Sequence, residues 1–403
     1  MLTKYKRILV LSLVFVFMLS MMTFASSAKT VGLGDEFTTI TGPDALYGNP
    51  GAINAGDSIF SLELGASVSA WNNLLMNDYI DDGDKEELLG KIEDDGLLFG
   101  AGARTGAKLI IGPVGLFGDI KHDGLLTLNS DIAELLLQGN EIGSEYEFDG
   151  SSASGALYGD GGINLSMQAP QDLVDSWGIE ELYVGFTYHQ LAGMIYELEG
   201  RGTGEFDYDE DGKGAFIGDD GYFSVKYNDP ADNLATGSAI DIGGYAVLDD
   251  RYTIGFSTMN IGSLIADGYT KSKYQYIDEE WEEEEQIDKD GELVWQLPST
   301  VRLGGKMDYN SNIDILADYA YTKYYESDHE DHKFSAATEL TWLSFLPLRT
   351  GVNYSTLQND FKWAAGMGLY LGPLKADVGI SDLMGLFNRS QGVEGALTAK
   401  IEF

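Results

Sequence analysis

Apolar and polar residues alternate along much of the chain with a period of two. The segment 301–309 (VRLGGKMDY) places Val, Leu, Gly, Met and Tyr on one face and Arg, Gly, Lys and Asp on the other. The same alternation returns in four further segments: 60–70, 313–321, 361–371 and 374–380. Because successive side chains of an extended strand point to opposite faces, this period predicts β-strands.

The C-terminal residues 393–403 (VEGALTAKIEF) show the same alternation and end on an aromatic residue, Phe403. This segment resembles the terminal strand that the assembly machinery of outer-membrane barrels recognises. We therefore predict that Phe403 is part of an assembly signal and that this machinery is a partner of the chain.

Three features favour a membrane barrel over a soluble β-sandwich, which would alternate in the same way. The alternating segments are about 9–11 residues long, the length with which a tilted strand crosses a bilayer. Aromatic residues gather near a strand end, at Tyr319, Tyr321, Tyr324 and Tyr325, where membrane barrels carry girdles. Short turns such as 309–312 alternate with long acidic loops, as they do in outer-membrane barrels.

The expected fold class is therefore all-β, an antiparallel transmembrane β-barrel of about 14 strands, within a range of roughly 12 to 16. Helices are expected only as excursions in loops, at 72–95, 130–138 and 170–177. Ser130 or Asp131 would cap the second helix, because their side chains accept hydrogen bonds from first-turn amides.

The N-terminus has the order of a secretory signal peptide. Lys4, Lys6 and Arg7 precede an apolar run from residue 8 to residue 24, and small residues follow at 25–28. A retained membrane anchor is the alternative. We predict a signal peptide over 1–28, an N-terminal plug-like segment over 29–57, a barrel over 58–403, and location in a cell outer membrane among its lipids. No later stretch predicts a spanning helix, so membrane insertion would require a closed barrel.

Charge and composition restrict the partners. The formal net charge is −40, which argues against nucleic acid as a partner, since phosphate binding needs a basic surface. The acidity is typical of a soluble surface or of adaptation to high salt, and a cation-attracting lumen or loop surface is the alternative. The chain has no cysteine, so disulfides play no part.

Two N-terminal motifs carry a resemblance to a known family. The stretch 28–34 (AKTVGLG) is followed by 42–51 (GPDALYGNPG), which is similar to the start of mature barrels in the FadL superfamily, a group that includes the PorV and TraF-like proteins. Gly51 stands where that family often has Ala. The resemblance implies a monomeric barrel with an N-terminal plug, and passage or binding of hydrophobic molecules or a structural role in export. The plug motif consists of Gly42, Pro43, Asp44, Ala45, Asn49, Pro50 and Gly51.

Charged residues on the polar faces of the strands are the candidates for lining the lumen, and a mixed lining suits a wet or plugged interior. These residues are Arg302, Lys306, Asp308, Asp314, Asp318, Lys362, Lys375 and Asp377.

Metal and catalytic chemistry find weaker support. Asp207, Asp209 and Asp211 match the first half of a calcium loop, but position 218 is Gly where a bidentate Glu is needed, so an acidic hairpin tip is the alternative. Four histidines are present: His189 is expected in the lumen, His122 at a strand end, and His329 and His332 in a loop. His329 and His332 have the spacing of a weak transition-metal clip, but no third or fourth ligand is identifiable. We find no nucleophile motif and predict no enzymatic activity and no cofactor, with calcium as the candidate ion.

Two classes of function follow from these observations. The first is passive uptake or binding of hydrophobic or small solutes through a plugged barrel, with a hydrophobic ligand as partner. The second is a barrel that does not transport and acts as a scaffold or partner in secretion or in the envelope; a cation-preferring porin is a further alternative. The acidic run 278–285 (DEEWEEEE) would gather cations or, more simply, form a solvated loop.

Overall fold

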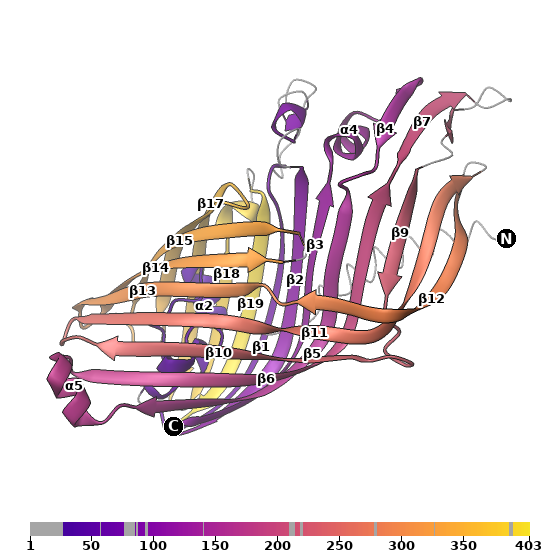
Figure 1. Ribbon diagram of the computed structural model, residues 1–403. Coiled ribbons are helices and arrows are strands. Elements are labelled where there is room, and N and C mark those ends of the chain that lie inside the picture. Colours follow the sequence, from indigo (N-terminus) through magenta and orange to yellow (C-terminus); the bar gives the residue numbers. More distant parts are fainter. Residues whose placement is uncertain are drawn as a thin grey trace.

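The computed structural model describes residues 27–403 except 57, 76–84, 86–87, 93–95, 140, 209–213, 218–220, 278–279, 326 and 387–389. The signal peptide expected at 1–28 therefore falls almost entirely outside the described residues. Fourteen antiparallel strands close into a barrel, which confirms the predicted fold class and strand number (Figure 1). Among the described residues, no helix is long and apolar enough to cross a membrane.

The barrel strands follow one another around the wall mostly in chain order, and β1 pairs with β19 to close it through partners such as Leu64 and Ala399. In this order they are β1 (Phe60–Asn72), β2 (Leu97–Ile111), β3 (Val114–Leu128), β5 (Ser152–Gln168), β6 (Glu181–Arg201), β10 (Ala235–Val247), β11 (Tyr252–Ile277), β13 (Ser299–Asn310), β14 (Ile313–Tyr324), β15 (His329–Leu340), β16 (Leu348–Ser355), β17 (Asp360–Leu371), β18 (Leu374–Ser381) and β19 (Gly392–Glu402).

The alternation of the sequence separates a polar interior from an apolar outer face. On β13, Leu303 is 58% exposed, whereas its neighbour Arg302 is 9% exposed. The same inversion holds on other strands, where Ile120 and Leu397 face outward and Lys121 and Lys400 are buried inside. An apolar exterior around a polar interior is the distribution of a barrel whose wall contacts lipid.

The two rims of the barrel differ. One rim, the turn rim, has connections such as the one between β17 and β18, where Gly372 adopts a positive φ of 64°. It also carries α5 (Gln171–Trp177) and a set of exposed aromatic residues: Trp177, Tyr309, Trp342, Phe345 and Phe403. Aromatic residues at a rim are typical of a membrane interface.

The opposite rim, the loop rim, carries the long connections (Figure 1). These contain α4 (Ser130–Gln138), β4 (Ser144–Glu147), β7 (Thr203–Tyr208), β8 (Gly214–Ile217), β9 (Tyr222–Tyr227), β12 (Glu280–Gln296) and the 3-10 helix η4 (Leu383–Leu386). Strand β9 lies between β6 and β11 above the end of β10, and β12 continues the wall above β13 by pairing with β11.

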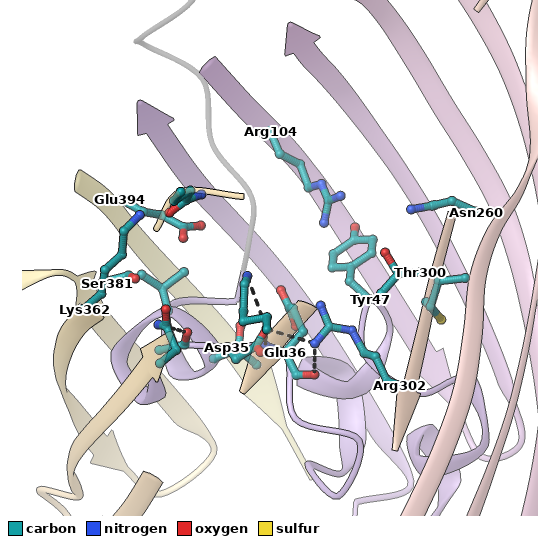
Figure 2. Close-up of a pocket in the computed structure, with 17 residues that line it drawn as sticks. Asp35, Glu36, Tyr47, Arg104, Asn260, Thr300, Arg302, Lys362, Ser381 and Glu394 are labelled. Carbon is teal, nitrogen blue, oxygen red and sulfur yellow. Dashed lines mark hydrogen bonds and ion pairs between the residues drawn. The ribbon is translucent and has the colours of Figure 1, made fainter. Parts of the chain in front are cut away.

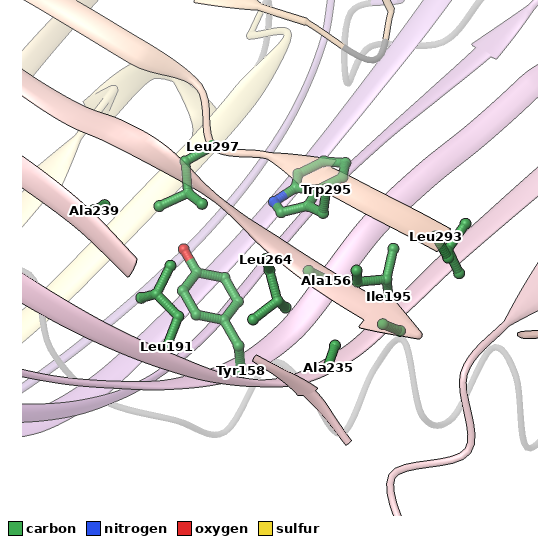
Figure 3. Packing of buried hydrophobic residues seen from close by; sticks show 11 residues of the cluster. Ala156, Tyr158, Leu191, Ile195, Ala235, Ala239, Leu264, Leu293, Trp295 and Leu297 are labelled. Carbon is green, nitrogen blue, oxygen red and sulfur yellow. The ribbon is translucent and has the colours of Figure 1, made fainter. Parts of the chain in front are cut away.

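An apolar cluster packs on the inner side of the wall near this rim (Figure 3). Tyr158, Leu191 and Leu264 are almost completely buried there, and Trp295 and Leu297 from β12 and its end close over them. The strand structure is interrupted between β12 and β13 at Pro298, a residue that cannot donate a ladder hydrogen bond. The break lets β12 turn inward, so its apolar side chains are covered.

The N-terminal segment lies inside the barrel (Figure 1). It consists of α2 (Ala28–Leu33) and the 3-10 helices η2 (Gly42–Ala45) and η3 (Pro50–Asn54). Helix α2 ends at Gly34, which takes a left-handed φ of 92°. A Cβ atom at Gly32 would lie 2.7 Å from the Cα atom of Gly366, so glycine on both sides permits α2 to lie directly against β17.

The structure corrects several local predictions. The α4 helix has the predicted bounds, but Asn129 caps it by accepting from the Ile132 amide, in place of Ser130 or Asp131. The acidic residues from 280 onward belong to β12 instead of a loop, because β11 is long enough to pair with them. His122 lies in the middle of β3, and His329 and His332 begin β15, since both strands extend beyond their apolar runs.

Candidate functional site

Buried ion pairs fix the N-terminal segment to the wall. Arg302 donates to Asp35 at 2.9 Å, and Lys333 lies 3.9 Å from the same carboxylate. Ser335 donates to the other oxygen of Asp35 at 2.6 Å. Burial alone would raise the pKa of Asp35, but Arg302 and Lys333 hold that pKa well below its usual range. The carboxylate is therefore charged at neutral pH and anchors the segment.

A second anchor lies closer to the turn rim. Lys400 of β19 donates to Asp44 at 2.6 Å, and the Ser27 hydroxyl donates to the other oxygen of this carboxylate. Burial would raise the pKa of Asp44, yet Lys400 keeps it below its usual range. On the same segment, Lys29 pairs with Glu339 of β15 at 2.9 Å. Anchors on opposite sides of the barrel hold the segment across its interior.

The Asn-Pro-Gly part of the plug motif is fixed by close contact with three wall glycines. The Asn49 amide donates to the carbonyl oxygens of Thr38 and Gly244, both at 2.8 Å. A Cβ atom at Gly51 would lie 2.8 Å from the carbonyl oxygen of Gly243, which explains why alanine does not fit here. A Cβ atom at Gly185 would lie 2.2 Å from the Pro50 carbonyl carbon.

Above the N-terminal segment, toward the loop rim, lies a polar cavity of about 260 Å³, the upper cavity (Figure 2). Its floor includes Asp35 and Glu36, and Tyr47 stands at one side. Burial raises the pKa of Glu36 to about 7, although Arg104 and Arg302 oppose this shift. The charged side chains that line the cavity are Asp35, Glu36, Arg104, Arg302, Lys333, Lys362 and Glu394.

Below the segment lies a second cavity of about 220 Å³, the lower cavity, lined by residues that include Thr39, Lys306 and Asp314. An apolar cluster borders the lower cavity, because two of its members, Ile40 and Leu316, belong to that lining. The cluster consists of Leu33, Phe37, Ile40, Leu316 and Ala337, with Phe37 fully buried.

Tyr47 connects the N-terminal segment to a charged network on β2 and β3. Its hydroxyl donates to Asp119, and its ring lies beneath the guanidinium of Arg104, 4.1 Å from the ring centroid. The ammonium of Lys108 lies 4.5 Å from the same centroid. Burial and the Asp119 carboxylate raise the pKa of Tyr47, so the hydroxyl remains a hydrogen-bond donor.

His189 bridges three strands of the inner wall beside this network. Its Nδ1 lies 3.0 Å from an Asp160 oxygen, and its Nε2 lies 2.8 Å from Asp241. Lys121 donates to Asp160, and Asp241 accepts from the Asn260 amide at 2.6 Å. The sequence predicted His189 in the lumen but not its two carboxylate partners, which come from β5 and β10.

The outer face of the same wall carries an apolar groove of about 1030 Å³ that we call the outer groove. It crosses β19, β1, β2, β3, β5 and β6 at one height, with Leu64, Ile120 and Leu397 among its outward-facing residues. Its hollow shape follows from small residues at neighbouring positions: Ala107, Gly118, Gly159, Gly161, Ala192 and Ala399. Asp119 reaches it from the inside.

All eight residues predicted to line the lumen project inward. Arg302 and Lys362 line the upper cavity, and Lys306 and Asp314 line the lower cavity. The others engage wall or plug partners: Asp308 pairs with Lys306 at 3.0 Å, Asp318 accepts from the Thr38 amide at 2.8 Å, Lys375 pairs with Glu402 at 3.1 Å, and Asp377 pairs with Arg349 at 2.6 Å. The structure thus divides these side chains between cavities and packing, and their part in passage stays a prediction.

Sequence reasoning missed Arg104, Lys333 and Glu394, which complete the upper cavity. Arg104 and Glu394 occupy polar positions of alternating strands, so the same pattern would have identified them as inward-facing.

Two other predictions lie apart from the cavities. Asp209 and Asp211 of the candidate calcium loop lie outside the described residues, and only the backbone of Asp207 is described, in a hairpin of β7 and β8. Phe403 is exposed at the turn rim, where its ring lies 6.1 Å from that of Phe60. Its role in assembly stays a prediction.

The class of protein is now defined: a closed, lipid-facing β-barrel whose interior is filled by its own N-terminal segment and whose polar cavities lie on either side of that segment. No family model and no curated protein matches the sequence.

Solved structures do match the fold. The Ralstonia pickettii toluene transporter TbuX is similar over 95% of this chain and 99% of its own, with a TM-score of 0.55 and 12% sequence identity. The Pseudomonas putida toluene transporter TodX is similar over 95% and 99%, with a TM-score of 0.56 and 12% identity. At this identity the likeness is one of fold: the chain shares the barrel architecture of these two transporters, which agrees with the barrel that the resemblance to the FadL superfamily implied.

Proposed function

We propose that the barrel mediates passive uptake of small hydrophobic solutes across a bacterial outer membrane. The two structures of the same fold are toluene transporters, and a related TodX variant is described as a monoaromatic hydrocarbon channel. The observation that carries the proposal for this chain is the outer groove, an apolar hollow on the lipid side of the wall. Apolar solutes leave water for such a surface spontaneously.

The connection between interior and groove supports this route. Tyr47 lines the upper cavity, Asp119 lines the outer groove, and the two are joined by a hydrogen bond. A straight route along the barrel axis would have to displace the buried cluster around Phe37. Passage through the wall would lead past the Tyr47–Asp119 pair and would require local separation of β2 and β3, which pair along their whole length in this structure. This route ends in the lipid that hydrophobic solutes prefer.

A cation-preferring porin gains no support from the upper cavity. Its lining contains four cationic side chains, Arg104, Arg302, Lys333 and Lys362, against three carboxylates, Asp35, Glu36 and Glu394. The acidity of the chain is therefore not concentrated in this cavity.

The test is a substitution that fills the outer groove and leaves the side chains of the interior unchanged. A Cβ atom at Gly118 would meet no heavy atom within 4 Å, and Gly118 lines the outer groove, so Gly118→Phe directs a ring into this groove. We expect this variant to reduce uptake of radiolabelled toluene by cells that depend on the barrel. Gly395→Phe is the matched control, because its Cβ atom also meets open space but lies outside the groove lining. Equal uptake by wild type and both variants would contradict the route, and no uptake by any of them would favour a barrel that does not transport.

A further inference from the structure

The upper cavity contains charged groups of both signs that have no ion-pair partner. Asp35 is occupied by Arg302 and Lys333. In contrast, four other charged residues of this lining form no ion pair within 4.0 Å among the described residues: Glu36, Arg104, Lys362 and Glu394. One oxygen of Glu36 is buried without a hydrogen-bond partner.

These groups lie on opposite sides of the cavity (Figure 2). Arg104 extends from β2 beside Tyr47, and its guanidinium is held over the tyrosine ring at 4.1 Å. Lys362 and Glu394 extend from β17 and β19 on the other side, and Glu36 lies on the floor between them. A cation and a carboxylate therefore face each other across the cavity.

The energetics of burial select among ligands. A hydrocarbon would remove water from these charges without replacing its hydrogen bonds, which is unfavourable for each buried charge. A simple anion would pair with Arg104 but would leave the carboxylate of Glu394, on the other side of the cavity, without a cationic partner. A simple cation would pair with Glu394 but would leave Arg104 without an anionic partner. A small molecule that carries both charges satisfies both sides, and charge-assisted hydrogen bonds are the stronger kind.

We propose that the upper cavity is a binding site for a small zwitterionic solute, whose carboxylate lies at Arg104 and whose cationic nitrogen lies at Glu394. A volume of about 260 Å³ is at the small end of ligand pockets. The side chains of Asn260, Thr300 and Ser381 add hydrogen-bonding groups to its lining. This site goes beyond hydrophobic uptake through the wall and does not depend on it.

The experiment compares glycine betaine and L-proline with their separated charges. Binding to the folded, detergent-solubilised protein is measured by calorimetry for glycine betaine, L-proline, acetate and tetramethylammonium. We expect saturable binding of at least one zwitterion, with acetate and tetramethylammonium weaker by about tenfold or more. Arg104→Gln and Glu394→Gln are each expected to weaken zwitterion binding by about tenfold. Lys375→Gln is the control, because Lys375 also faces the interior but pairs with Glu402 near the turn rim.

Three outcomes would overturn the proposal: no saturable binding of either zwitterion, acetate binding as tight as that of the zwitterions, or unchanged affinity in both Gln variants. Correct folding of each variant is checked by the faster gel migration of unheated barrel protein. Toluene uptake is measured on the same variants, so failure of the zwitterion site and failure of the hydrophobic route give different results.

Discussion

The hydroxyl of Tyr47, which lines the upper cavity, donates a hydrogen bond to the carboxylate of Asp119, a residue that borders the outer groove. Asp119 lies across Gly106 of the neighbouring strand, where a Cβ atom would be 1.9 Å from its Oδ1 atom. That oxygen has no hydrogen-bond partner in the described part of the chain. Asp119 therefore depends on Tyr47 more than a fully bonded carboxylate would.

Removing the hydrogen bond between Tyr47 and Asp119 should loosen the contact between the N-terminal segment and β3. Tyr47→Phe keeps the ring beneath Arg104 but leaves Asp119 without its donor, at a cost of about 1–3 kcal/mol. We expect a lower unfolding temperature and faster toluene uptake, because the route from cavity to groove opens more often. Tyr354→Phe is the control, since that hydroxyl bonds Asn359 on the exposed surface. Unchanged uptake together with unchanged stability would show that the Tyr47 hydroxyl limits neither the passage of toluene nor the stability of the barrel.

Breaking a plug anchor should release the N-terminal segment. Asp35→Asn leaves Arg302 buried without its carboxylate, and the loss of one partner of a buried pair costs about 3–5 kcal/mol. We expect channel openings in planar bilayers that the wild type does not show, because the apolar cluster around Phe37 moves with the segment. Glu330→Gln removes an exposed pair with Lys323 at 4.0 Å and should change stability by less than about 1 kcal/mol. A closed Asp35→Asn barrel would contradict the anchoring role.

The barrel itself could be predicted from the sequence because one local rule, alternation, determines which face of each strand meets lipid. Alternation alone is enough to place Leu303 on the outer face and Arg302 on the inner face, without knowledge of the rest of the fold. Strand number followed from counting such segments. The acidic run that became β12 was misplaced because its composition is that of a loop, and only the length of β11 supplies the partner that makes it a strand.

The candidate site could be predicted only in part. Alternation indicates that Arg302 and Lys362 face inward, but it does not show which of them is neutralised by the plug. Arg302 pairs with Asp35, 267 residues away in the chain, whereas Lys362 stays without a partner in the described structure. The sequence did not predict the outer groove for another reason. The groove forms where glycine and alanine residues of several strands lie side by side, and which residues lie side by side depends on the strand register, which the sequence pattern does not give.

We expect that only glycine fits sterically at position 185, where the wall contacts Pro50 of the N-terminal segment. Gly185→Ala would place a Cβ atom 2.2 Å from the carbonyl carbon of Pro50, a backbone atom that cannot move away alone. We expect displacement of the Asn-Pro-Gly segment, with a lower unfolding temperature and increased cleavage of the segment by added protease. Gly395→Ala, at a position with open space, should behave as wild type. Equal protease resistance of the two variants would mean that the contact is not a steric constraint.

The stability of the plug should depend on pH through Glu36. Burial raises the pKa of Glu36 from 4.5 to about 7, while Arg104, Arg302 and Lys108 lower it and Asp35 raises it. Because the folded pKa exceeds the unfolded one, ionisation opposes folding: the penalty is absent below about pH 4.5, grows from there, and is complete above about pH 7. Glu36→Gln removes the penalty, so it should stabilise the protein at pH 8, by at most roughly 3 kcal/mol, and have little effect at pH 4. Urea unfolding of wild type and variant at both pH values measures this, with Glu330→Gln as an exposed control. A gain of the same size at pH 4 and pH 8 would rule out ionisation of Glu36 as its cause.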